Sequence, residues 1–245
     1  RDRLGRPLAR LGKGAFSAVR LHADCEGRPV AVKSYAHAEM EQNACVRQHL
    51  MNENAIAARR LEHEGIIAPQ SVVRRQGRTE VQMQYAPGGN LGEYARRKNG
   101  LSEGEARRLF RQVVEAVGYL HAKDICHRDI KPENIVLDSQ RNAKLVDFGA
   151  AREGAHVMMH SVQGTPAFMA PEVMQGRAHA GAPSDVWSLG VTLVSLLLPD
   201  QLPFWGKDIR ELKHAIARDP PKLPSTLSAS CRDLLRKLLH KQAAC

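Results

Sequence analysis

Polar side chains near the middle of the chain have the types and spacing of a chemical site. The tripeptide His127-Arg128-Asp129 is followed, five residues after its aspartate, by Asn134, and a second aspartate opens the segment Asp147-Phe148-Gly149. One carboxylate can accept a proton. The amide oxygen and the other carboxylate are hard ligands of the kind that Mg²⁺ prefers. The spacing predicts two turns joined by a short hairpin, which suits transfer of a phosphoryl group from a metal-bound nucleotide. A single tripeptide would be weak evidence.

Two further signals near the start of the chain fit a bound nucleotide. Gly12 and Gly14 lie in a predicted turn between two strands, where glycines let backbone amides approach phosphate oxygens closely. Ser17 stands where a G-x-G-x-x-G pattern has its third glycine, so an ordinary hairpin turn is the alternative. On a period of two, Ala31 and Lys33 share one face of a predicted strand. That pairing suits a flat base with phosphates nearby, and the alternative is a lysine on an exposed edge.

Together these segments resemble the eukaryotic protein kinase family. The resemblance covers essentially the whole chain, because six signals occur in family order. They are the glycine turn, the Lys33 strand, the segments 127–134 and 147–149, Ala170-Pro171-Glu172, and the segment 185–190. The resemblance implies an α+β, bilobal fold, with a small β-rich N-terminal lobe that carries one main helix and a larger helical C-terminal lobe. We expect the lobes to span residues 1–86 and 87–245, with a hinge at Pro87-Gly88-Gly89.

The resemblance also implies roles for individual residues, with ATP and Mg²⁺ as cofactors. Lys33 would hold the α- and β-phosphates and pair with Glu53. The rival carboxylates on the same predicted helix are Glu39, Glu41 and Glu62. Asp129 would accept or orient the proton of the substrate hydroxyl, and Lys131 would neutralise charge on the moving phosphoryl group. Removing Lys33 or Asp147 should cost far more rate than folding stability.

The remaining implied roles concern the nucleotide and the metal. The metal ligands would be Asn134 and Asp147, and the phosphates would lie against Gly12 and Gly14. Residues at the adenine ring would be Val19, Ala31 and Val136, with Met83 at the back of the pocket and backbone hydrogen bonds from Gln84 to Ala86. His127 and Phe148 are interpreted as packing residues, and Asp185 as an acceptor for backbone amides of the 127–134 turn.

The serine/threonine type is favoured by Lys131, two residues after Asp129, and by Gly164-Thr165-Pro166. The part from Leu202 to Leu239 resembles the calcium/calmodulin-dependent kinase group. The implied activity is transfer of the γ-phosphoryl group of Mg-ATP to a Ser or Thr hydroxyl of a protein substrate. The alternative is a pseudokinase scaffold that binds partners without phosphoryl transfer.

Regulation is suggested by Arg128, since family members often use this arginine to bind a phosphorylated activation segment. Here that segment would span residues 150–165, and Ser161 lies where many relatives carry the phosphate. The alternative is an unmodified loop serine.

Periodicity predicts the elements that position these residues. Strands are predicted at 19–21, 29–35 and 79–84, a hairpin at 135–137 and 144–146, and a helix at 39–61. A capping box, Ser102 with Glu105, opens a helix whose apolar spacing runs to Leu120. Ser184 is predicted to cap an apolar helix that begins near Asp185. Two more helices are expected at 208–217 and 228–240.

Composition narrows the possible partners. Lys and Arg total 36 against 26 for Asp and Glu, a net charge of +10, but the basic residues are scattered, so a nucleic-acid partner is not expected. Aromatic residues, at 4%, leave little for base stacking. The five cysteines lack a C-x-x-C pair, which argues against a disulfide framework or zinc site and favours an intracellular location, cytoplasmic or nuclear.

Neither end of the chain reads as a natural terminus. No secretory signal or initiator methionine opens it, and its longest apolar stretch, 186–198, is too short to span a membrane. We therefore expect an excised domain. Its C-terminal lobe would be truncated, because relatives carry an arginine just beyond this point that pairs with the counterpart of Glu172. The physiological substrate, the upstream activator and the oligomeric state are not encoded in any visible motif.

Overall fold

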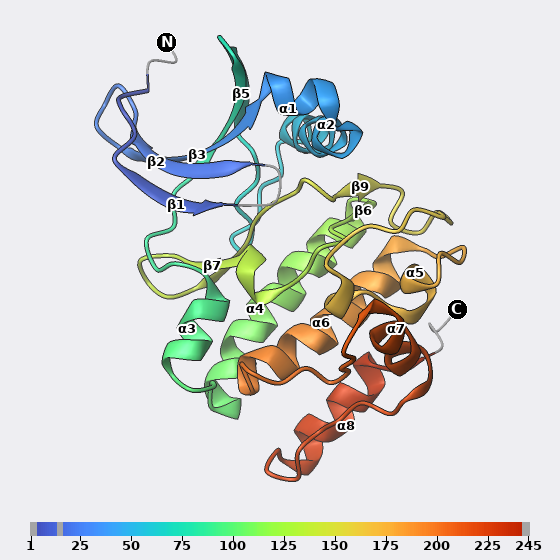
Figure 1. Cartoon of the computed structure of the whole chain (residues 1–245). Helices are drawn as coiled ribbons and strands as arrows, with labels where there is room; N and C mark the ends of the chain where they lie inside the picture. The colour runs from blue at the N-terminus through green and yellow to red at the C-terminus, as the bar shows by residue number, and fades with distance from the viewer. Residues whose placement is uncertain (1–3, 14–16, 242–245) are drawn as a thin grey trace. The chain divides into compact units, whose positions relative to one another are not determined.

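The computed structural model describes residues 4–13 and 17–241, which form two compact units (Figure 1). The first unit comprises the described residues up to Pro87 together with Val146–Gly149. The second comprises Gly88–Leu145 and the described residues from Ala150 onward. The first unit is rich in β-structure and the second is mainly helical, so the α+β fold class predicted from the sequence is confirmed.

The first unit contains a five-stranded antiparallel sheet in the order β1-β2-β3-β5-β4. Its strands are β1 (Ala9–Lys13), β2 (Ala18–Ala23), β3 (Pro29–Ala36), β4 (Ser71–Arg75) and β5 (Arg78–Gln84). The predicted strands correspond to β2, β3 and β5. Strand β1 is the strand expected before the glycine turn, and it includes Gly12, which was predicted to lie in the turn itself. Strand β4 was not predicted. Strand β3 is central, and its Val32 and Tyr35 are fully buried. Gly77, in the turn between β4 and β5, has a φ of 75°, a left-handed conformation that glycine adopts without strain.

Two helices, rather than the single predicted helix 39–61, accompany the sheet. Helix α1 (His37–Gln42) ends before Asn43, and α2 (Ala44–Ala58) begins after it. Asn43 has extended backbone angles, and its side chain accepts a hydrogen bond of 2.9 Å from the Cys45 amide. Asparagine is among the best N-cap residues because it satisfies a free amide at a helix start. The prediction of one continuous helix was wrong because it overlooked this cap.

The second unit is built around the buried helix α6 (Gly181–Leu197) (Figure 1). Helices α3, α4 and α8 contact it. The other helices are α3 (Leu91–Arg97), α4 (Glu103–Ala122), α5 (Pro171–Met174), α7 (Ile209–Arg218) and α8 (Ala229–Leu238), with 3-10 turns η1 (Pro132–Asn134) and η2 (Pro166–Phe168). Two small sheets pair β6 (Ile125–Cys126) with β9 (Arg152–Glu153), and β7 (Ile135–Leu137) with β8 (Ala143–Leu145).

The predicted starts of α4 and α6 had different outcomes. The Ser102 hydroxyl accepts from the Glu105 amide at 3.3 Å, which confirms a serine cap on α4. Helix α6 begins at Gly181, so the prediction of a start near Asp185 was wrong. Ser184 lies inside the helix and donates to the Ala180 carbonyl at 3.0 Å. A serine hydroxyl can bond the carbonyl four residues earlier as readily as it can cap, and sequence alone does not distinguish the two.

Within the part of the chain that the structure describes, no helix combines the length and the apolar character that crossing a membrane requires. Helix α6, with 17 residues, is the buried core helix that its apolar sequence predicted.

Candidate functional site

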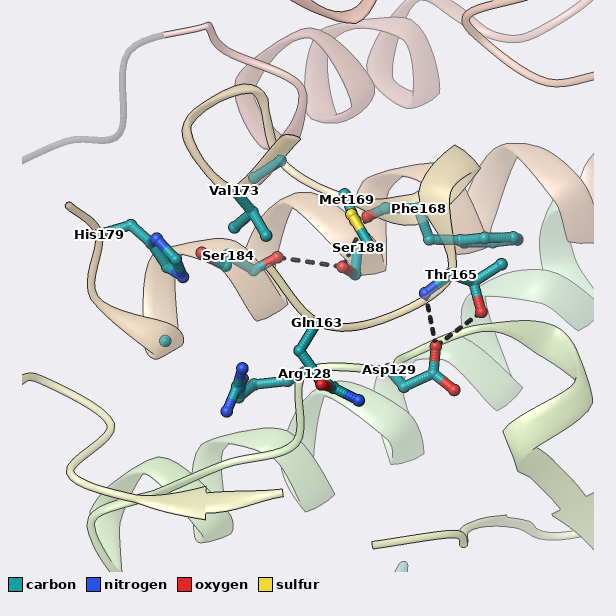
Figure 2. A pocket seen from close by; sticks show the side chains of 12 residues that line it. Arg128, Asp129, Gln163, Thr165, Phe168, Met169, Val173, His179, Ser184 and Ser188 are labelled. Atoms are coloured by element: carbon teal, nitrogen blue, oxygen red, sulfur yellow. Dashed lines mark hydrogen bonds between the residues drawn. The ribbon is translucent and has the colours of Figure 1, made fainter. Parts of the chain in front are cut away.

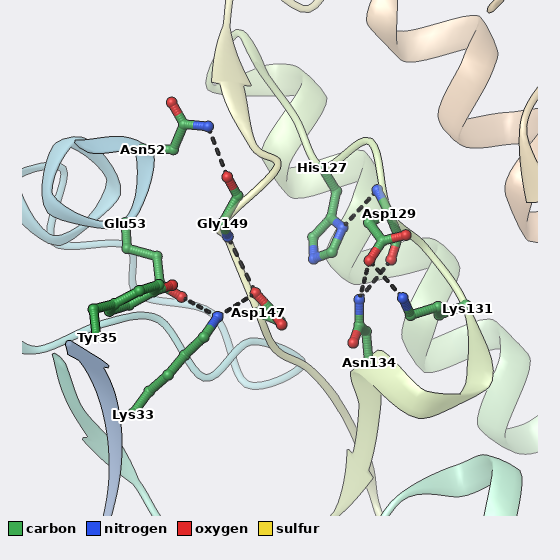
Figure 3. Close-up of polar contacts among 10 residues, drawn as sticks. All are labelled: Lys33, Tyr35, Asn52, Glu53, His127, Asp129, Lys131, Asn134, Asp147 and Gly149. Atoms are coloured by element: carbon green, nitrogen blue, oxygen red, sulfur yellow. Dashed lines mark hydrogen bonds and ion pairs between the residues drawn. The ribbon is translucent and has the colours of Figure 1, made fainter. Parts of the chain in front are cut away.

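The first unit brings together an ammonium and two carboxylates from three different segments (Figure 3). The Lys33 Nζ atom lies 2.7 Å from Glu53 Oε1 and 2.7 Å from Asp147 Oδ1. Lys33 comes from β3, Glu53 from α2, and Asp147 from the segment Val146–Gly149. The Lys33 and Glu53 side chains are 6% and 0% exposed, whereas Asp147 is 38% exposed. The charged pair is therefore buried, and the third member remains open to a ligand.

Burial and charge act against each other in this group. Burial disfavours the Lys33 ammonium, but Asp147 and Glu53 outweigh it, so the pKa of Lys33 is raised well above its usual value. Burial also raises the pKa of Glu53, which Lys33 opposes. Two carboxylates around one lysine keep that lysine charged in the interior.

Tyr35 is a member of this group that the sequence analysis missed. Its hydroxyl donates to Glu53 Oε2 at 3.0 Å, and its ring is fully buried. Strand alternation could have found it, because Tyr35 lies two residues beyond Lys33 on the same face of β3. Lys33 bonds Glu53 Oε1 and Tyr35 bonds Glu53 Oε2, so both carboxylate oxygens have a partner.

The second unit brings together the other predicted chemical residues in the 127–134 turn (Figure 3). Lys131 Nζ lies 2.8 Å from Asp129 Oδ2. Asn134 donates through Nδ2 to Asp129 Oδ2 at 2.9 Å and to the Asp129 carbonyl at 2.8 Å. Pro132 begins η1, where its missing amide costs nothing, and η1 carries Asn134 back toward Asp129. Because the amide nitrogen makes both bonds, the Asn134 Oδ1 atom can serve as a metal ligand.

A threonine hydroxyl bonds the same carboxylate (Figure 2). Thr165 donates to Asp129 Oδ1 through its amide at 3.0 Å and its hydroxyl at 2.7 Å, and the hydroxyl accepts from Lys131 at 2.7 Å. Gly164 approaches the Arg128 carbonyl so closely that a Cβ there would lie 2.5 Å from it. Because Gly164 lies this close to Arg128, the next residue, Thr165, lies within hydrogen-bond distance of Asp129. The small cavity beside them measures about 20 Å³, enough for about one water molecule.

Asp185 anchors the 127–134 turn from α6. Its carboxylate is fully buried and accepts from the amides of His127 at 2.9 Å and Arg128 at 2.7 Å. The predicted role of Asp185 as an acceptor for this turn is confirmed. The imidazole of His121 lies 2.9 Å from the same carboxylate, a contact that the sequence analysis did not anticipate. His127 is buried, as is Phe148 in the first unit, in keeping with their interpretation as packing residues.

Most of the predicted nucleotide residues lie on neighbouring strands of the first unit. Gly12 pairs with Val19, Val19 with Lys33, and Ala31 with Met83. Gln84 ends β5 and Ala86 follows it in the chain. Val136 lies on β7 in the second unit. Gly14 lies outside the described residues.

The donor chemistry of these residues fits a magnesium nucleotide better than a metal held by protein alone. Among the described residues, no group of three or more His, Cys, Asp or Glu side chains could hold a metal ion. Mg²⁺ is usually bound by one or two protein oxygen ligands and completes its shell with water and phosphate oxygens. The carboxylate of Asp147 and the amide oxygen of Asn134 are ligands of this kind.

Comparison with known proteins identifies the family. A model of the protein kinase domain matches residues 6–244. CBL-interacting protein kinase 4 of Oryza sativa subsp. japonica is 38% identical over 240 residues, 94% of this chain and 52% of the relative. CBL-interacting protein kinase 16 of the same organism is 36% identical over 235 residues, 94% of this chain and 51% of the relative. The chain therefore belongs to the protein kinase family. It spans about half the length of these two relatives.

Proposed function

We propose that this chain transfers the γ-phosphoryl group of Mg-ATP to a Ser or Thr hydroxyl of a protein substrate. The single observation that carries the proposal is the buried Lys33–Glu53 pair with Asp147 at 2.7 Å from the same ammonium. An ion pair at this depth is costly to build and rarely adds stability, so its presence calls for a functional reason. A lysine kept charged beside a more exposed carboxylate suits nucleotide phosphates and their metal.

In this proposal the first unit binds and orients the nucleotide. Lys33 binds the α- and β-phosphates, and Glu53 with Tyr35 fixes the direction of its ammonium. Gly12 and Gly14 would lie along the phosphates, and Val19 and Ala31 would contact the adenine together with Val136 of the second unit. Met83 would close the back of the adenine pocket, and backbone groups from Gln84 to Ala86 would bond the edge of the ring. We also propose that the N-terminal lobe spans residues 1–86 and the C-terminal lobe residues 87–245.

The second unit handles the acceptor hydroxyl. Asp129 orients the hydroxyl and accepts its proton, while Lys131 neutralises charge on the phosphoryl oxygens. Thr165 supports this assignment, because its hydroxyl already lies within 2.7 Å of both Asp129 and Lys131. A substrate Ser or Thr hydroxyl would need the same two contacts.

Asn134 and Asp147 would bind Mg²⁺ through one oxygen each. When bound, the magnesium nucleotide supplies the phosphoryl group and a metal charge that stabilises the phosphate oxygens during transfer. The protein contributes position and electrostatics, with little covalent chemistry of its own.

The test is incorporation of labelled phosphate into a mixture of Ser- and Thr-containing peptides, with the Asp147→Ala variant as control. Transfer by the unmodified chain, with Mg²⁺ and ATP, is the expected result. Nucleotide binding without transfer would favour a pseudokinase scaffold. If the chain neither binds the nucleotide nor transfers phosphate, the proposal is wrong.

We also propose that phosphorylation of Ser161 activates the enzyme. Arg128 Nη2 donates to the Ser161 hydroxyl at 2.7 Å. Burial lowers the pKa of the Arg128 guanidinium, and the nearby charge of Arg152 lowers it further. A phosphate on Ser161 would give this half-buried cation an anionic partner and order the segment around it.

We expect Ser161→Ala to lower kcat by about tenfold, the size of one strong charge-assisted hydrogen bond. Ser139→Ala, at an exposed turn of the same unit, is the matched control and should have no effect. Phosphosite mapping by mass spectrometry accompanies the assay. Full activity of a protein that carries no phosphate on Ser161 would end this proposal.

A further inference from the structure

Helix α2 reaches the Asp147 segment through a second residue, next to Glu53 in the chain. Asn52 donates through Nδ2 to the Gly149 carbonyl at 2.7 Å (Figure 3). Its Oδ1 accepts from Gln48 Nε2 at 2.8 Å, one helical turn earlier. The Gln48 bond orients the Asn52 amide, so that its nitrogen points at the carbonyl. Helix α2 is therefore linked to the segment Val146–Gly149 in two ways. Asn52 bonds the Gly149 carbonyl directly, and Glu53 is linked to Asp147 through Lys33.

The His49 side chain of α2 lies close to Gly149. A Cβ atom built on Gly149 would lie 2.6 Å from His49 Nδ1 and 3.2 Å from Asp147 Oδ1. His49 precedes Asn52 by three residues and Glu53 by four, so the three side chains share one face of α2. A larger residue at position 149 would force the His49 imidazole to shift, so glycine permits the close approach at which Asn52 bonds the carbonyl.

The segment that Asn52 holds is strained. Asp147 has φ 64°, a left-handed conformation that residues other than glycine adopt only occasionally. The Gly149 amide donates to Asp147 Oδ1 at 3.2 Å. Because Asn52 bonds the carbonyl of that same glycine, Gln48, Asn52, Gly149 and Asp147 are connected in series. Such conformations persist only where surrounding contacts over-determine them.

We propose that Asn52 is a positioning residue: its hydrogen bond to the Gly149 carbonyl couples the position of α2 to the orientation of the Asp147 carboxylate. The inference rests on the proposed function, in which Asp147 binds the metal. It predicts that losing the bond impairs the use of Mg²⁺ and the rate of transfer, while peptide binding and the rest of the fold are unaffected.

The test compares four variants in the full chain. Asn52→Ala removes the donor, and Asn52→Asp keeps the size but faces the carbonyl with a carboxylate. Asn54→Asp makes the same charge change at an exposed position of the same helix and is the matched control. Gln48→Ala removes the bond that orients Asn52.

We expect kcat to fall about fivefold in Asn52→Ala, the size of one hydrogen bond, and further in Asn52→Asp. The Mg²⁺ concentration for half-maximal rate should rise in both, and KM for the peptide should not change. Gln48→Ala should have a smaller effect that disappears in the Asn52→Ala background, because the two residues act in series.

A second readout does not depend on activity. Hydrogen exchange in the metal-free protein should become faster in a peptide that contains Val146–Gly149 in the Asn52 variants, with exchange in β3 unchanged. The inference is overturned if Asn52→Asp matches Asn54→Asp in both kcat and exchange. It is also overturned if exchange rises uniformly and Tm falls, since Asn52 would then be a general stabiliser. If the unmodified chain transfers no phosphate, the proposed function fails, while the exchange data still decide whether Asn52 holds the segment.

Discussion

Replacing Asp147 by asparagine should lower the rate of phosphoryl transfer by about 10³-fold, the upper range for removing one electrostatic contact in a reacting site. The carboxylate would be lost as a metal ligand, and the amide that replaces it carries no charge. Asparagine is the right substitute because it tolerates the left-handed backbone of position 147, where φ is 64°. The measurement is kcat with saturating ATP and peptide, over a range of Mg²⁺ concentrations.

Stability should respond far less to the same change. The Asp147 side chain is 38% exposed, and Lys33 keeps its bond to Glu53 when Asp147 is changed. We therefore expect a loss of about 1 kcal/mol or less in the free energy of unfolding, as for other partly exposed ion pairs. A variant that keeps more than a tenth of the rate would contradict the assignment of Asp147 to the metal. A variant that unfolds would show that the contact is mainly structural.

Replacing Lys33 by methionine should be severe in both activity and stability. Glu53 is fully buried and, among the residues that the structure describes, would keep its bond to Tyr35. Breaking a buried pair by removing one partner costs about 3–5 kcal/mol, because an uncompensated charge stays inside. From the sequence alone we expected the loss of rate on removing Lys33 to be far larger than the loss of folding stability. Its burial changes that expectation, and chemical denaturation measures the difference.

The double variant Lys33→Met with Glu53→Gln separates the two effects. It removes the stranded charge, so most of the lost stability should return, whereas activity should not. If the double variant is as unstable as Lys33→Met, the buried charge is not the cause of the loss. If it regains activity, Lys33 does not bind the phosphates.

The stability of Lys33→Met should also depend on pH in a defined direction. Burial raises the pKa of Glu53 in the folded protein, and Lys33 opposes that rise, so removing Lys33 raises the pKa further. A carboxyl group whose pKa is higher in the folded state binds protons more tightly there. Its charged form destabilises the fold at a pH above the pKa of the folded state. This penalty disappears as the pH falls to the pKa that the carboxyl group has in the unfolded state. The deficit of Lys33→Met should therefore shrink on acidification, both relative to the unmodified chain and relative to the double variant, which lacks the Glu53 carboxyl.

The features predicted from the sequence and confirmed by the structure are those that short local patterns encode. Gly77, the Ser102 cap and the alternation of 79–84 are encoded within a few neighbouring residues, and these features occur in the structure. The helix bounds that were predicted wrongly lie at residues whose side chains can act in two ways. Asn43 caps a second helix instead of continuing one, and Ser184 bonds backward inside α6 instead of capping it.

The sequence by itself determined the family, the fold class and the residue types of the site, because the spacing of Asp129, Asn134 and Asp147 is written along one chain. Only the tertiary structure decided which carboxylate pairs with Lys33. Several glutamates lie between residues 39 and 62, and Glu53 is the one whose side chain is buried against the lysine. The tertiary structure also decided that Tyr35 and Asn52 support the site. Those contacts join β3, α2 and the segment at Gly149, which are far apart in sequence, and no local pattern specifies which side chains meet when such segments pack together.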